Sequence, residues 1–402
     1  MRILYGFAGR RHSSGHPIPR KVIHIVENLD RGAVENWLVR MLRFGRESGI
    51  ELDWTFYCAL ARTGALNAQV QSLGARIVYS PAPIGDKVRF MTALRRELRR
   101  SRYDVLHCHH DLVSAVYLAA AYGLPVDRRI VHVHNADESV LTPNPIKQRI
   151  LRPLLRRICL ATADRIAGNS NHTLDCFLAG RARRQGRDLV HYYSADPALF
   201  TKARNDRTAF RRELGFTDDT RILLFAGRMV PEKNPLFALE VLAQLRRLDP
   251  TAVGVFAGSG SLDGALRARA EQLGLAAVFR PLGWRDDLPE VMGCSDWFIL
   301  PHPEHPPEGF GLAVVEAQLA GLRLLLSYGI LDDPLLPQAR VRRLALADGP
   351  QAWARAAMEI MAEPTPSRSE ALADLKASPM DMARAFDGLL ALHGVGVQGR
   401  AA

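Results

Sequence analysis

The sequence predicts an α/β protein made of two doubly wound parallel-sheet domains in series. The first observation is that short apolar runs alternate with longer helical patterns along the chain, which is typical of βα units. The second is that this alternation fades over the polar stretch Asp196–Arg207 and then restarts. Because 402 residues are too many for one ordinary hydrophobic core, we interpret that stretch as a linker between two domains.

The first domain is expected to span residues 21–197, after a basic leader over residues 1–20. The leader lacks the continuous apolar core of a signal peptide. Helical patterns cover Val34–Arg46, Val88–Arg100 and Leu112–Ala121. Seven strands are predicted between these helices, at Lys21–Val26, Leu52–Cys58, Arg76–Tyr79, Val105–His107, Arg129–His134, Arg165–Gly168 and Leu189–His191.

The second domain is expected to span residues 198–379. Its strands are predicted at Arg221–Ala226, Ala252–Ala257, Val278–Leu282, Trp297–Leu300 and Leu322–Ser327, and its helices at Asn234–Leu248, Leu262–Gln272, Leu288–Met292 and Ala313–Ala320. A last amphipathic helix is predicted at Met380–Leu392. Ser378 and Pro379 just before it suit an N-cap and a first helical position.

The composition is that of a folded protein. Hydrophobic residues make up 48% and charged residues 24% of the chain. The chain has no run of eighteen or more apolar residues, so we expect no membrane-spanning helix. Five cysteines are scattered without a CxxC pair, which predicts neither a disulfide framework nor a zinc cluster and fits a cytoplasmic location.

The positive charge is concentrated in the first half of the chain. Residues 1–200 carry 30 lysines and arginines against 17 acidic residues, whereas residues 201–402 carry 23 against 25. This asymmetry favours an anionic partner for the first half, such as a phosphorylated substrate, an anionic membrane face or nucleic acid. Because lysine is scarce and arginine abundant, genomic base composition explains the asymmetry equally well.

The strongest functional signal is the segment PPEGFGLAVVEAQLA at Pro306–Ala320, which follows a predicted buried strand and opens a helix. Gly309 and Gly311 lie at the turn, where small residues let a ligand approach the backbone. The free N–H groups at a helix start suit a phosphate or a sugar hydroxyl. Glu308 and Glu316 are eight residues apart, and carboxylates accept paired hydroxyl hydrogen bonds. One carboxylate is therefore expected to hold a sugar and the other a ribose.

At this segment the chain resembles the retaining GT-B glycosyltransferases of family 4, also called group 1, which carry a Glu-x7-Glu motif in an EGFG context. The resemblance covers roughly residues 21–395. It implies the GT-B fold, in which two Rossmann-like domains face each other across a cleft. It also implies that the final helix, within residues 380–395, returns to the first domain.

The resemblance extends to substrates and partners. It implies a UDP- or GDP-linked sugar as donor, a glycan or lipid-linked acceptor, and a role in bacterial surface polysaccharide assembly. It implies neither a cofactor nor a metal ion. The implied location is cytoplasmic, with peripheral contact at the inner face of the cell membrane.

A second motif, LLFAGRMVPEKNP, follows the first predicted strand of the second domain and supplies Gly227, Arg228 and Lys233. In the family the matching arginine and lysine grip the donor diphosphate. The physical reason is that a departing nucleoside diphosphate builds negative charge, which fixed cations stabilise. The resemblance implies a catalytic set consisting of Arg228, Lys233, Glu308 and His134. It implies a donor-binding set consisting of Gly227, Gly258, Trp284, Gly309, Phe310, Gly311, Leu312 and Glu316.

Two segments between these motifs resemble the family in order and spacing. Gly258 and Gly260 follow a strand and are expected to let the backbone approach the donor. Trp284 is expected to stack on the nucleobase, or else to belong to the core. Asp286 and Asp287 form either a metal pair or, as we expect, an N-cap for the helix at Leu288.

In the first domain, LDRGAVENWL resembles the glycine-rich acceptor-side loop of the family, with Gly32 followed by Ala33 where relatives have a second glycine. Five histidines, at positions 107, 109, 110, 132 and 134, follow two predicted strands and raise a metal hypothesis. Alternating residues face opposite sides of a sheet, so we expect that not all of them reach one ion. The resemblance places His134 near the donor sugar.

A basic amphipathic segment covers Ile146–Leu160, and Pro153 is expected to break it into two helical pieces. Four arginines alternate with isoleucine and leucine, at positions 149, 152, 156 and 157. This pattern predicts a helix on an anionic membrane surface, or alternatively a solvated helix packed on the first domain.

The sequence offers three other functional classes. The first is another GT-B enzyme, such as a sugar-nucleotide epimerase, and the Glu308/Glu316 pair argues against it. An NAD-dependent oxidoreductase should show GxGxxG after the first strand, and the chain has ENLDRGAVE there. The third is a non-enzymatic protein. The retained Arg228, Lys233 and glutamate set argues against an inactive nucleotide-sugar-binding protein, and the lack of a helix-turn-helix or zinc module argues against nucleic-acid binding.

Overall fold

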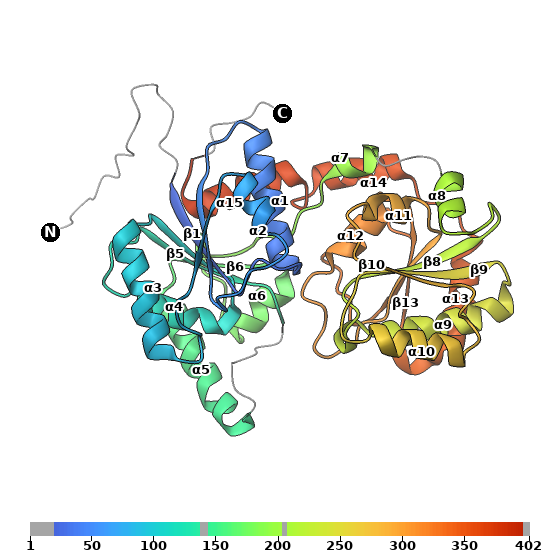
Figure 1. Cartoon of the computed structure of the whole chain (residues 1–402), viewed down its shortest axis with the longest axis horizontal. Coiled ribbons are helices and arrows are strands. Elements are labelled where there is room, and N and C mark those ends of the chain that lie inside the picture. The colour runs from blue at the N-terminus through green and yellow to red at the C-terminus, as the bar shows by residue number, and fades with distance from the viewer. Residues whose placement is uncertain (1–19, 137–143, 203–206, 397–402) are drawn as a thin grey trace.

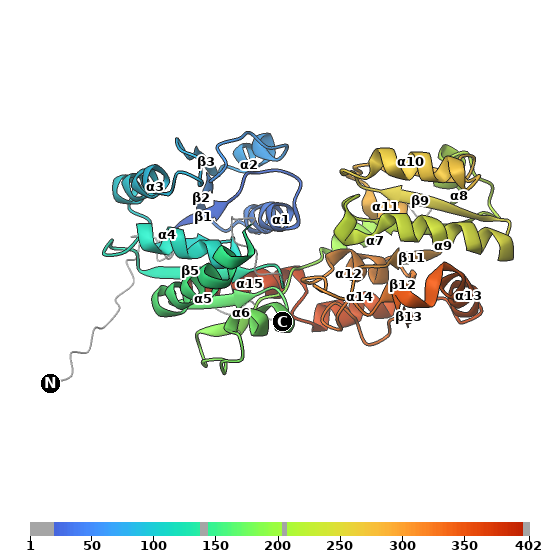
Figure 2. The ribbon, with the colours of Figure 1, turned by 90° about the horizontal axis from the view of Figure 1, so that it is seen from below.

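The computed structural model describes residues 20–136, 144–202 and 207–396, so residues 1–19 of the predicted leader lie outside it. Two separate parallel sheets lie side by side, one from each half of the chain (Figure 1). Helices cover both faces of each sheet, as the view from below shows (Figure 2). This arrangement confirms the predicted α/β class with two doubly wound domains.

The first sheet has seven parallel strands in the order β3-β2-β1-β4-β5-β6-β7. They are β1 (Lys21–Val26), β2 (Asp53–Cys58), β3 (Arg76–Tyr79), β4 (Val105–Cys108), β5 (Arg128–Val133), β6 (Arg165–Gly168) and β7 (Asp188–Val190). Every strand predicted for this domain is present, with ends shifted by at most one residue. The strand order reverses between β1 and β4, which makes the carboxyl ends of these two strands the expected ligand side of the sheet.

The helices of this domain are α1 (Ala33–Glu47), α2 (Asn67–Ser72), α3 (Lys87–Ser101), the 3-10 turn η1 (Asp111–Val113), α4 (Ser114–Ala120), α5 (Pro145–Thr162) and α6 (Asn171–Leu178). Helix α1 forms because its apolar residues recur every three or four positions. It buries Trp37, Leu38, Met41 and Leu42 against the sheet.

The second sheet has six parallel strands in the order β10-β9-β8-β11-β12-β13, the same winding as the first. They are β8 (Arg221–Ala226), β9 (Ala252–Ala257), β10 (Phe279–Gly283), β11 (Trp297–Leu300), β12 (Arg323–Ser327) and β13 (Val341–Leu344). The sequence analysis missed β13. This edge strand reads VRRL and is half-buried throughout, so it lacks the apolar run that marks the other strands.

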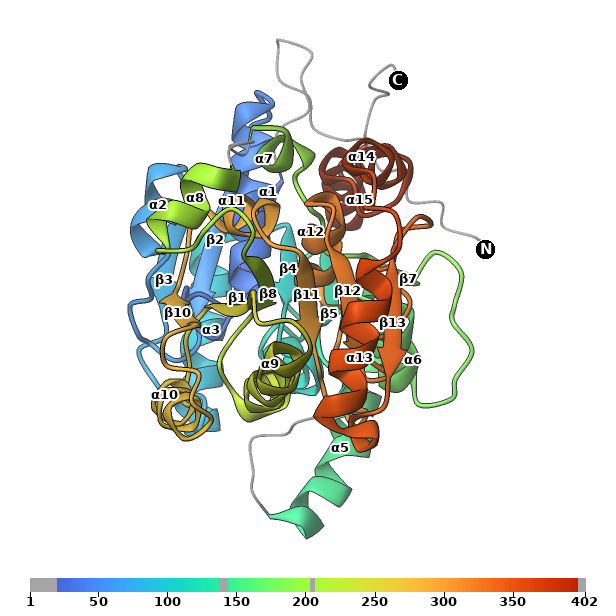
Figure 3. The ribbon, with the colours of Figure 1, turned by 90° about the vertical axis from the view of Figure 1, so that its right-hand side faces the viewer.

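The remaining helices are α7 (Pro197–Lys202), α8 (Arg207–Glu213), the 3-10 turn η2 (Pro231–Lys233), α9 (Pro235–Leu248), α10 (Asp263–Gln272), α11 (Leu288–Gly293), α12 (Leu312–Leu319), the 3-10 turn η3 (Leu346–Asp348), α13 (Gly349–Met361), α14 (Arg368–Ala377) and α15 (Met382–His393). Helices α9 and α13 pack against each other, and both are prominent in the view onto the second domain (Figure 3).

The last helix, α15, packs on α1 of the first domain, as the resemblance implied. The Phe44 and Phe386 rings meet edge to face with centroids 5.3 Å apart. The predicted cap is wrong, however. Asp381, not Ser378, caps α15, and its side chain accepts hydrogen bonds from two backbone N–H groups of the first turn.

Two other expectations need correction. Pro153 does not break the basic segment, because α5 runs continuously through it as an 18-residue helix. The stretch Asp196–Arg207 is not wholly irregular, because α7 forms within it; residues 203–206 lie outside the described ones.

Candidate active site

The predicted motifs lie at the carboxyl ends of strands beside the two reversal points. The loop with Arg228 and Lys233 follows β8, and the loop with Glu308 follows β11; these two strands flank the reversal point of the second sheet. Across from them lie the loop after β1 and the start of α1. The strand topology therefore brings together residues that are far apart in the sequence.

Lys233 and Glu308 form an ion pair at the centre of this region, with both side chains largely buried. Burial raises the pKa of Glu308, but the charges of Lys233, His302 and Arg228 outweigh it, so its pKa lies below the usual value. The carboxylate is thus ionised at neutral pH. Arg228 is exposed, and its charge acts on Glu308, so a second cation lies near this ion pair.

The loop 308–311 has a fixed shape. The Glu308 N–H donates to the Gly329 carbonyl over 2.8 Å, and Gly311 adopts the left-handed φ of 85° at the N-cap of α12. Glycine takes this conformation without the strain of a Cβ atom. The Phe310 ring points away from solvent and meets the rings of Tyr192 and Tyr193 at 5.7 and 5.8 Å. At Phe310 the backbone alone is left for a donor.

Gly309 lies against the first domain. A Cβ atom at this position would stand 2.3 Å from the His134 carbonyl oxygen and 3.5 Å from Asn169 Nδ2. Asn169 Nδ2 itself donates to the His134 carbonyl over 2.9 Å. Only glycine lets the two domains meet here without displacement.

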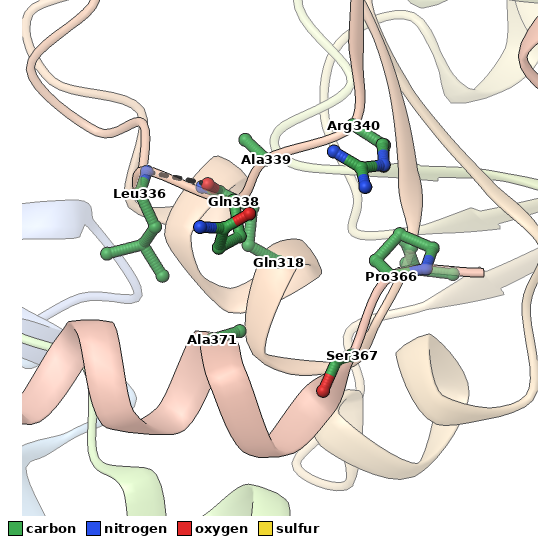
Figure 4. Close-up of a pocket in the computed structure, with 9 residues that line it drawn as sticks. Gln318, Leu336, Gln338, Ala339, Arg340, Pro366, Ser367 and Ala371 are labelled. Carbon is green, nitrogen blue, oxygen red and sulfur yellow. Dashed lines mark hydrogen bonds between the residues drawn. The ribbon is translucent and has the colours of Figure 1, made fainter. Parts of the chain in front are cut away.

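Glu316 is the fifth residue of α12, just over one turn into the helix, and makes a contact that the sequence did not predict. Arg40 of α1 donates to its Oε1 over 2.7 Å, so one carboxylate oxygen bridges the domains. Two residues further along α12, Gln318 accepts from the Leu336 N–H over 2.7 Å (Figure 4). Its side-chain amide also donates to the Val314 and Pro334 carbonyls. Helix α12, which carries Glu316, is therefore fixed by hydrogen bonds to the segment 334–336.

The glycine turns of the second domain serve first to pack loops together. The Gly258 N–H donates to the Gly283 carbonyl over 2.7 Å, and a Cβ on Gly258 would stand 1.9 Å from the Gly227 oxygen. Likewise, Gly260 lies against the Met229 carbonyl. This reason for the glycines differs from the predicted approach of a donor to the backbone.

Trp284 is not a core residue, because 38% of its surface is exposed. The guanidinium of Arg31, from the first domain, lies 5.0 Å from its ring centroid. Asp286 accepts from the indole N–H, and Asp287 holds Arg285 in an ion pair. Asp287 precedes α11 as expected, but its side chain makes no capping hydrogen bond.

Gly32 and Ala33 lie where α1 begins, with Gly32 as the N-cap. Their neighbour Glu35, like Arg40, is a residue that the sequence did not predict for this site. Burial, together with the charges of Glu27 and Asp30, raises the pKa of the Glu35 carboxyl to about 7, although a backbone hydrogen bond and the charge of Arg228 lower it. Its coupling to Arg228 links Glu35 to the predicted phosphate site, although an isolated acidic residue in a helix gives no such signal in sequence.

We predict that Glu35 makes donor binding pH-dependent. A carboxyl with a raised pKa is neutral below pH 7 and charged above it, and the new charge competes with the donor diphosphate for Arg228. The donor KM should rise roughly fivefold between pH 6 and pH 8.5, which corresponds to about 1 kcal/mol. Glu35→Gln should keep the low-pH KM throughout. An equally steep rise in the Glu35→Gln variant would show that another group titrates.

Both ring nitrogens of His134 lie within hydrogen-bond distance of residues of the first domain. Its Nδ1 lies 2.8 Å from the Tyr193 hydroxyl and its Nε2 lies 3.0 Å from His109 Nδ1. Burial lowers the pKa of His134 to about 3, so the ring is neutral. His134 contacts the EGFG loop at Gly309 through its carbonyl oxygen rather than its ring.

Comparison with known proteins gives a consistent result. The profile of the glycosyl transferases group 1 family matches residues 206–368, and that of glycosyltransferase family 4 matches residues 34–184. The putative glycosyltransferase EpsF of Bacillus subtilis is 27% identical over 89% of this chain and 92% of its own length.

Two further known proteins are similar to this chain. A UDP-Gal:alpha-D-GlcNAc-diphosphoundecaprenol alpha-1,3-galactosyltransferase of Escherichia coli is 26% identical to this chain. The matched region covers 59% of this chain and 61% of the galactosyltransferase. The crystal structure of HepE from Anabaena in complex with UDP-glucose superposes with a TM-score of 0.74 at 18% identity, covering 92% of this chain and 98% of HepE. The structural match confirms the GT-B fold.

Proposed function

The chain belongs to the group 1 glycosyltransferases of family 4, and from that premise we propose that it moves a hexosyl group from a nucleotide-diphosphate sugar to a lipid-linked or glycan acceptor with retention of anomeric configuration. A UDP-linked donor and a polyprenyl diphosphate-linked acceptor are the first candidates, because the galactosyltransferase relative is named for both. Surface polysaccharide assembly is the proposed setting.

The observation that carries this proposal is the set of charges around Glu308. Lys233 is fixed by its ion pair with Glu308, and Arg228 beside it is exposed. Two cations on rigid strand-end loops stabilise the charge that develops on a departing diphosphate. The acceptor hydroxyl attacks C1 from the face that the diphosphate leaves, and its proton passes to the leaving phosphate oxygen.

The remaining residues take positioning roles in this proposal. The free oxygen of Glu316 accepts from the ribose hydroxyls, while its other oxygen keeps Arg40. The backbone of Gly309–Leu312 and the Glu308 carboxylate orient the transferred sugar. Trp284 provides a ring face at the nucleobase, and Gly32 and Ala33 begin the helix that faces the acceptor.

The first test is thermal unfolding of the full chain against UDP, GDP, UDP-sugars, GDP-sugars and NAD. A ligand at about 100 times its Kd adds about 2.7 kcal/mol, which raises Tm by a few degrees. A shift with one nucleotide family would support the donor site and identify the base. A shift with NAD alone, or with none, would overturn the proposal. Proton NMR of the product then tests retention.

The proposed lipid acceptor fits the surface of α5. Its exposed apolar residues Ile146, Ile150 and Leu154 are spaced by four and share one face, with exposed fractions of 72%, 64% and 51%. Exposed Lys147, Arg149 and Arg157 lie on the same helix. Figures 1 and 3 both show α5 extending from the first domain. We propose that this face docks on an anionic membrane. Every described helix is too short or too polar to cross a bilayer.

We predict that the double substitution Ile146→Glu and Ile150→Glu weakens binding to vesicles containing phosphatidylglycerol at least tenfold. Each substitution removes a burial worth about 1.5–3 kcal/mol and adds a repelled charge. Co-sedimentation measures the effect. The matched control is Leu248→Glu, which makes the same kind of change at a half-exposed position of the second domain. Equal loss in both variants, or binding that salt does not weaken, would contradict membrane docking by α5.

A further inference from the structure

Seven buried histidines form one contiguous group in the core of the first domain, which we call the imidazole cluster. Its members are His24, His107, His109, His132, His134, His191 and His393. The expectation that not all five histidines at positions 107, 109, 110, 132 and 134 reach one ion holds, although four of them lie together. Positions 107 and 109 are two residues apart and share a sheet face, as do 132 and 134. Only His110 of the five points away, toward Tyr117.

Hydrogen bonds connect much of the imidazole cluster but leave gaps. His24 Nδ1 lies 3.1 Å from His109 Nε2, and His107 Nδ1 lies 3.0 Å from His393 Nε2. His24 Nε2, however, is buried with no hydrogen-bond partner in the described structure. A buried polar atom without a partner carries a desolvation cost, and in native proteins it usually indicates an unseen water, ion or functional role.

Three of these rings have the spacing of a metal site. The centroids of His24, His107 and His393 are separated by 5.1, 5.4 and 5.2 Å. Three imidazoles on one tetrahedral ion, with bonds of about 2.05 Å, have centroids about 5.2 Å apart. One ring nitrogen from each residue lies within 4.8 Å of the others. The second group that meets this nitrogen criterion, His107 with His109 and His132, is less regular, with centroids 4.2, 5.4 and 5.6 Å apart.

We propose that His24, His107 and His393 bind one transition-metal ion, with Zn²⁺ as the first candidate. Imidazole nitrogen is a preferred ligand of Zn²⁺, Cu²⁺, Ni²⁺ and iron, whereas Mg²⁺ and Ca²⁺ select oxygen ligands. His24 would coordinate through Nε2, the nitrogen that has no other partner. Three imidazoles leave a fourth position open.

The surrounding imidazoles support the tautomers that this site needs. When His24 Nε2 binds the ion, His24 Nδ1–H donates to His109 Nε2. His109 Nδ1–H then donates to His134 Nε2 over 3.0 Å. His134 Nδ1–H in turn donates to the Tyr193 hydroxyl. His107 likewise keeps Nε2–H for His132 Nδ1 at 3.2 Å. Metal-bound histidines commonly donate their second N–H in this way, which fixes ring orientation.

The position of the ligands gives the ion a structural role. His24 lies on β1, His107 on β4, and His393 ends α15, the helix that returns from the second domain. An ion here fastens the C-terminal helix to the two central strands of the first sheet. Because metal binding stabilises the folded state, loss of the ion should destabilise the first domain. This inference does not depend on the identity of donor or acceptor.

The test uses the full chain without an affinity tag. Metal content is measured by plasma mass spectrometry after purification, and again after unfolding with a chelator and refolding with Zn²⁺ or Co²⁺ alone. We expect about one ion per chain, the visible absorption of four-coordinate Co²⁺, and a Tm raised by several degrees with Zn²⁺. His393→Gln should lose most of the metal. His172→Gln, on α6 outside the cluster, should retain it.

Two results would overturn the site. The first is wild-type protein that refolds with neither bound metal nor a four-coordinate Co²⁺ spectrum. The second is a folded His393→Gln variant that binds as much metal as wild type. If His393→Gln does not fold, the wild-type Co²⁺ spectrum alone decides.

Discussion

Replacing Arg228 with alanine is expected to lower kcat/KM by about 10²–10³-fold, the range found when one fixed donor to a developing anion is removed. Lys233 is already engaged with Glu308, whose carboxylate is ionised, so Arg228 supplies the positive charge that is not neutralised within this group. The side chain is exposed, and its loss should leave Tm nearly unchanged.

The effect is measured as the rate of nucleoside diphosphate release. The donor used is the one that raises Tm in the thermal unfolding experiment. Arg228→Lys should recover part of the activity because it keeps a charge but loses the planar fork of donors. The matched control is Arg247→Ala, which removes an exposed arginine from α9 of the same domain. Activity within a few-fold of wild type in Arg228→Ala would refute the assignment of Arg228 to the donor diphosphate.

The sequence was most informative where one local pattern determines one element. All seven strands of the first domain follow from short apolar runs, because the strands of a parallel sheet covered on both faces are rich in apolar residues. The same reasoning missed β13, where two arginines occupy a half-buried edge. Pro153 shows the opposite error, since packing of α5 on α4 retains a helix that local preference would interrupt.

The site likewise contains residues that a local motif predicts and residues that only tertiary contacts bring into it. Glu308, Lys233 and the EGFG turn carry local motifs, so the sequence predicted them together. Arg40 and Glu35 carry no motif, because their importance comes from residues over 190 positions away. The imidazole cluster joins His24 to His393 across almost the whole chain, and only the return of α15 to the first sheet makes them neighbours.

Gly309→Ala is expected to lower kcat by about 10²-fold, because misplacing reacting groups by about 1 Å costs that much. The new methyl group would stand 2.3 Å from the His134 carbonyl oxygen, which Asn169 holds with a hydrogen bond. The clash is with backbone, so it is relieved only by moving the EGFG loop or by separating the domains. Moving the loop shifts the adjacent Glu308 carboxylate from Lys233, whereas separating the domains moves the acceptor side away from an intact donor loop.

The matched control is Gly264→Ala, which adds the same methyl group in the first turn of α10, where a Cβ would meet nothing within 4 Å. It should leave kcat unchanged and favour the helix. Donor-induced thermal shifts in Gly309→Ala separate the two consequences of the clash. A retained shift with lost turnover indicates separated domains with an intact donor loop, whereas loss of both indicates a displaced loop. Wild-type turnover in Gly309→Ala would show that the contact between Gly309 and His134 is not part of the catalytic state.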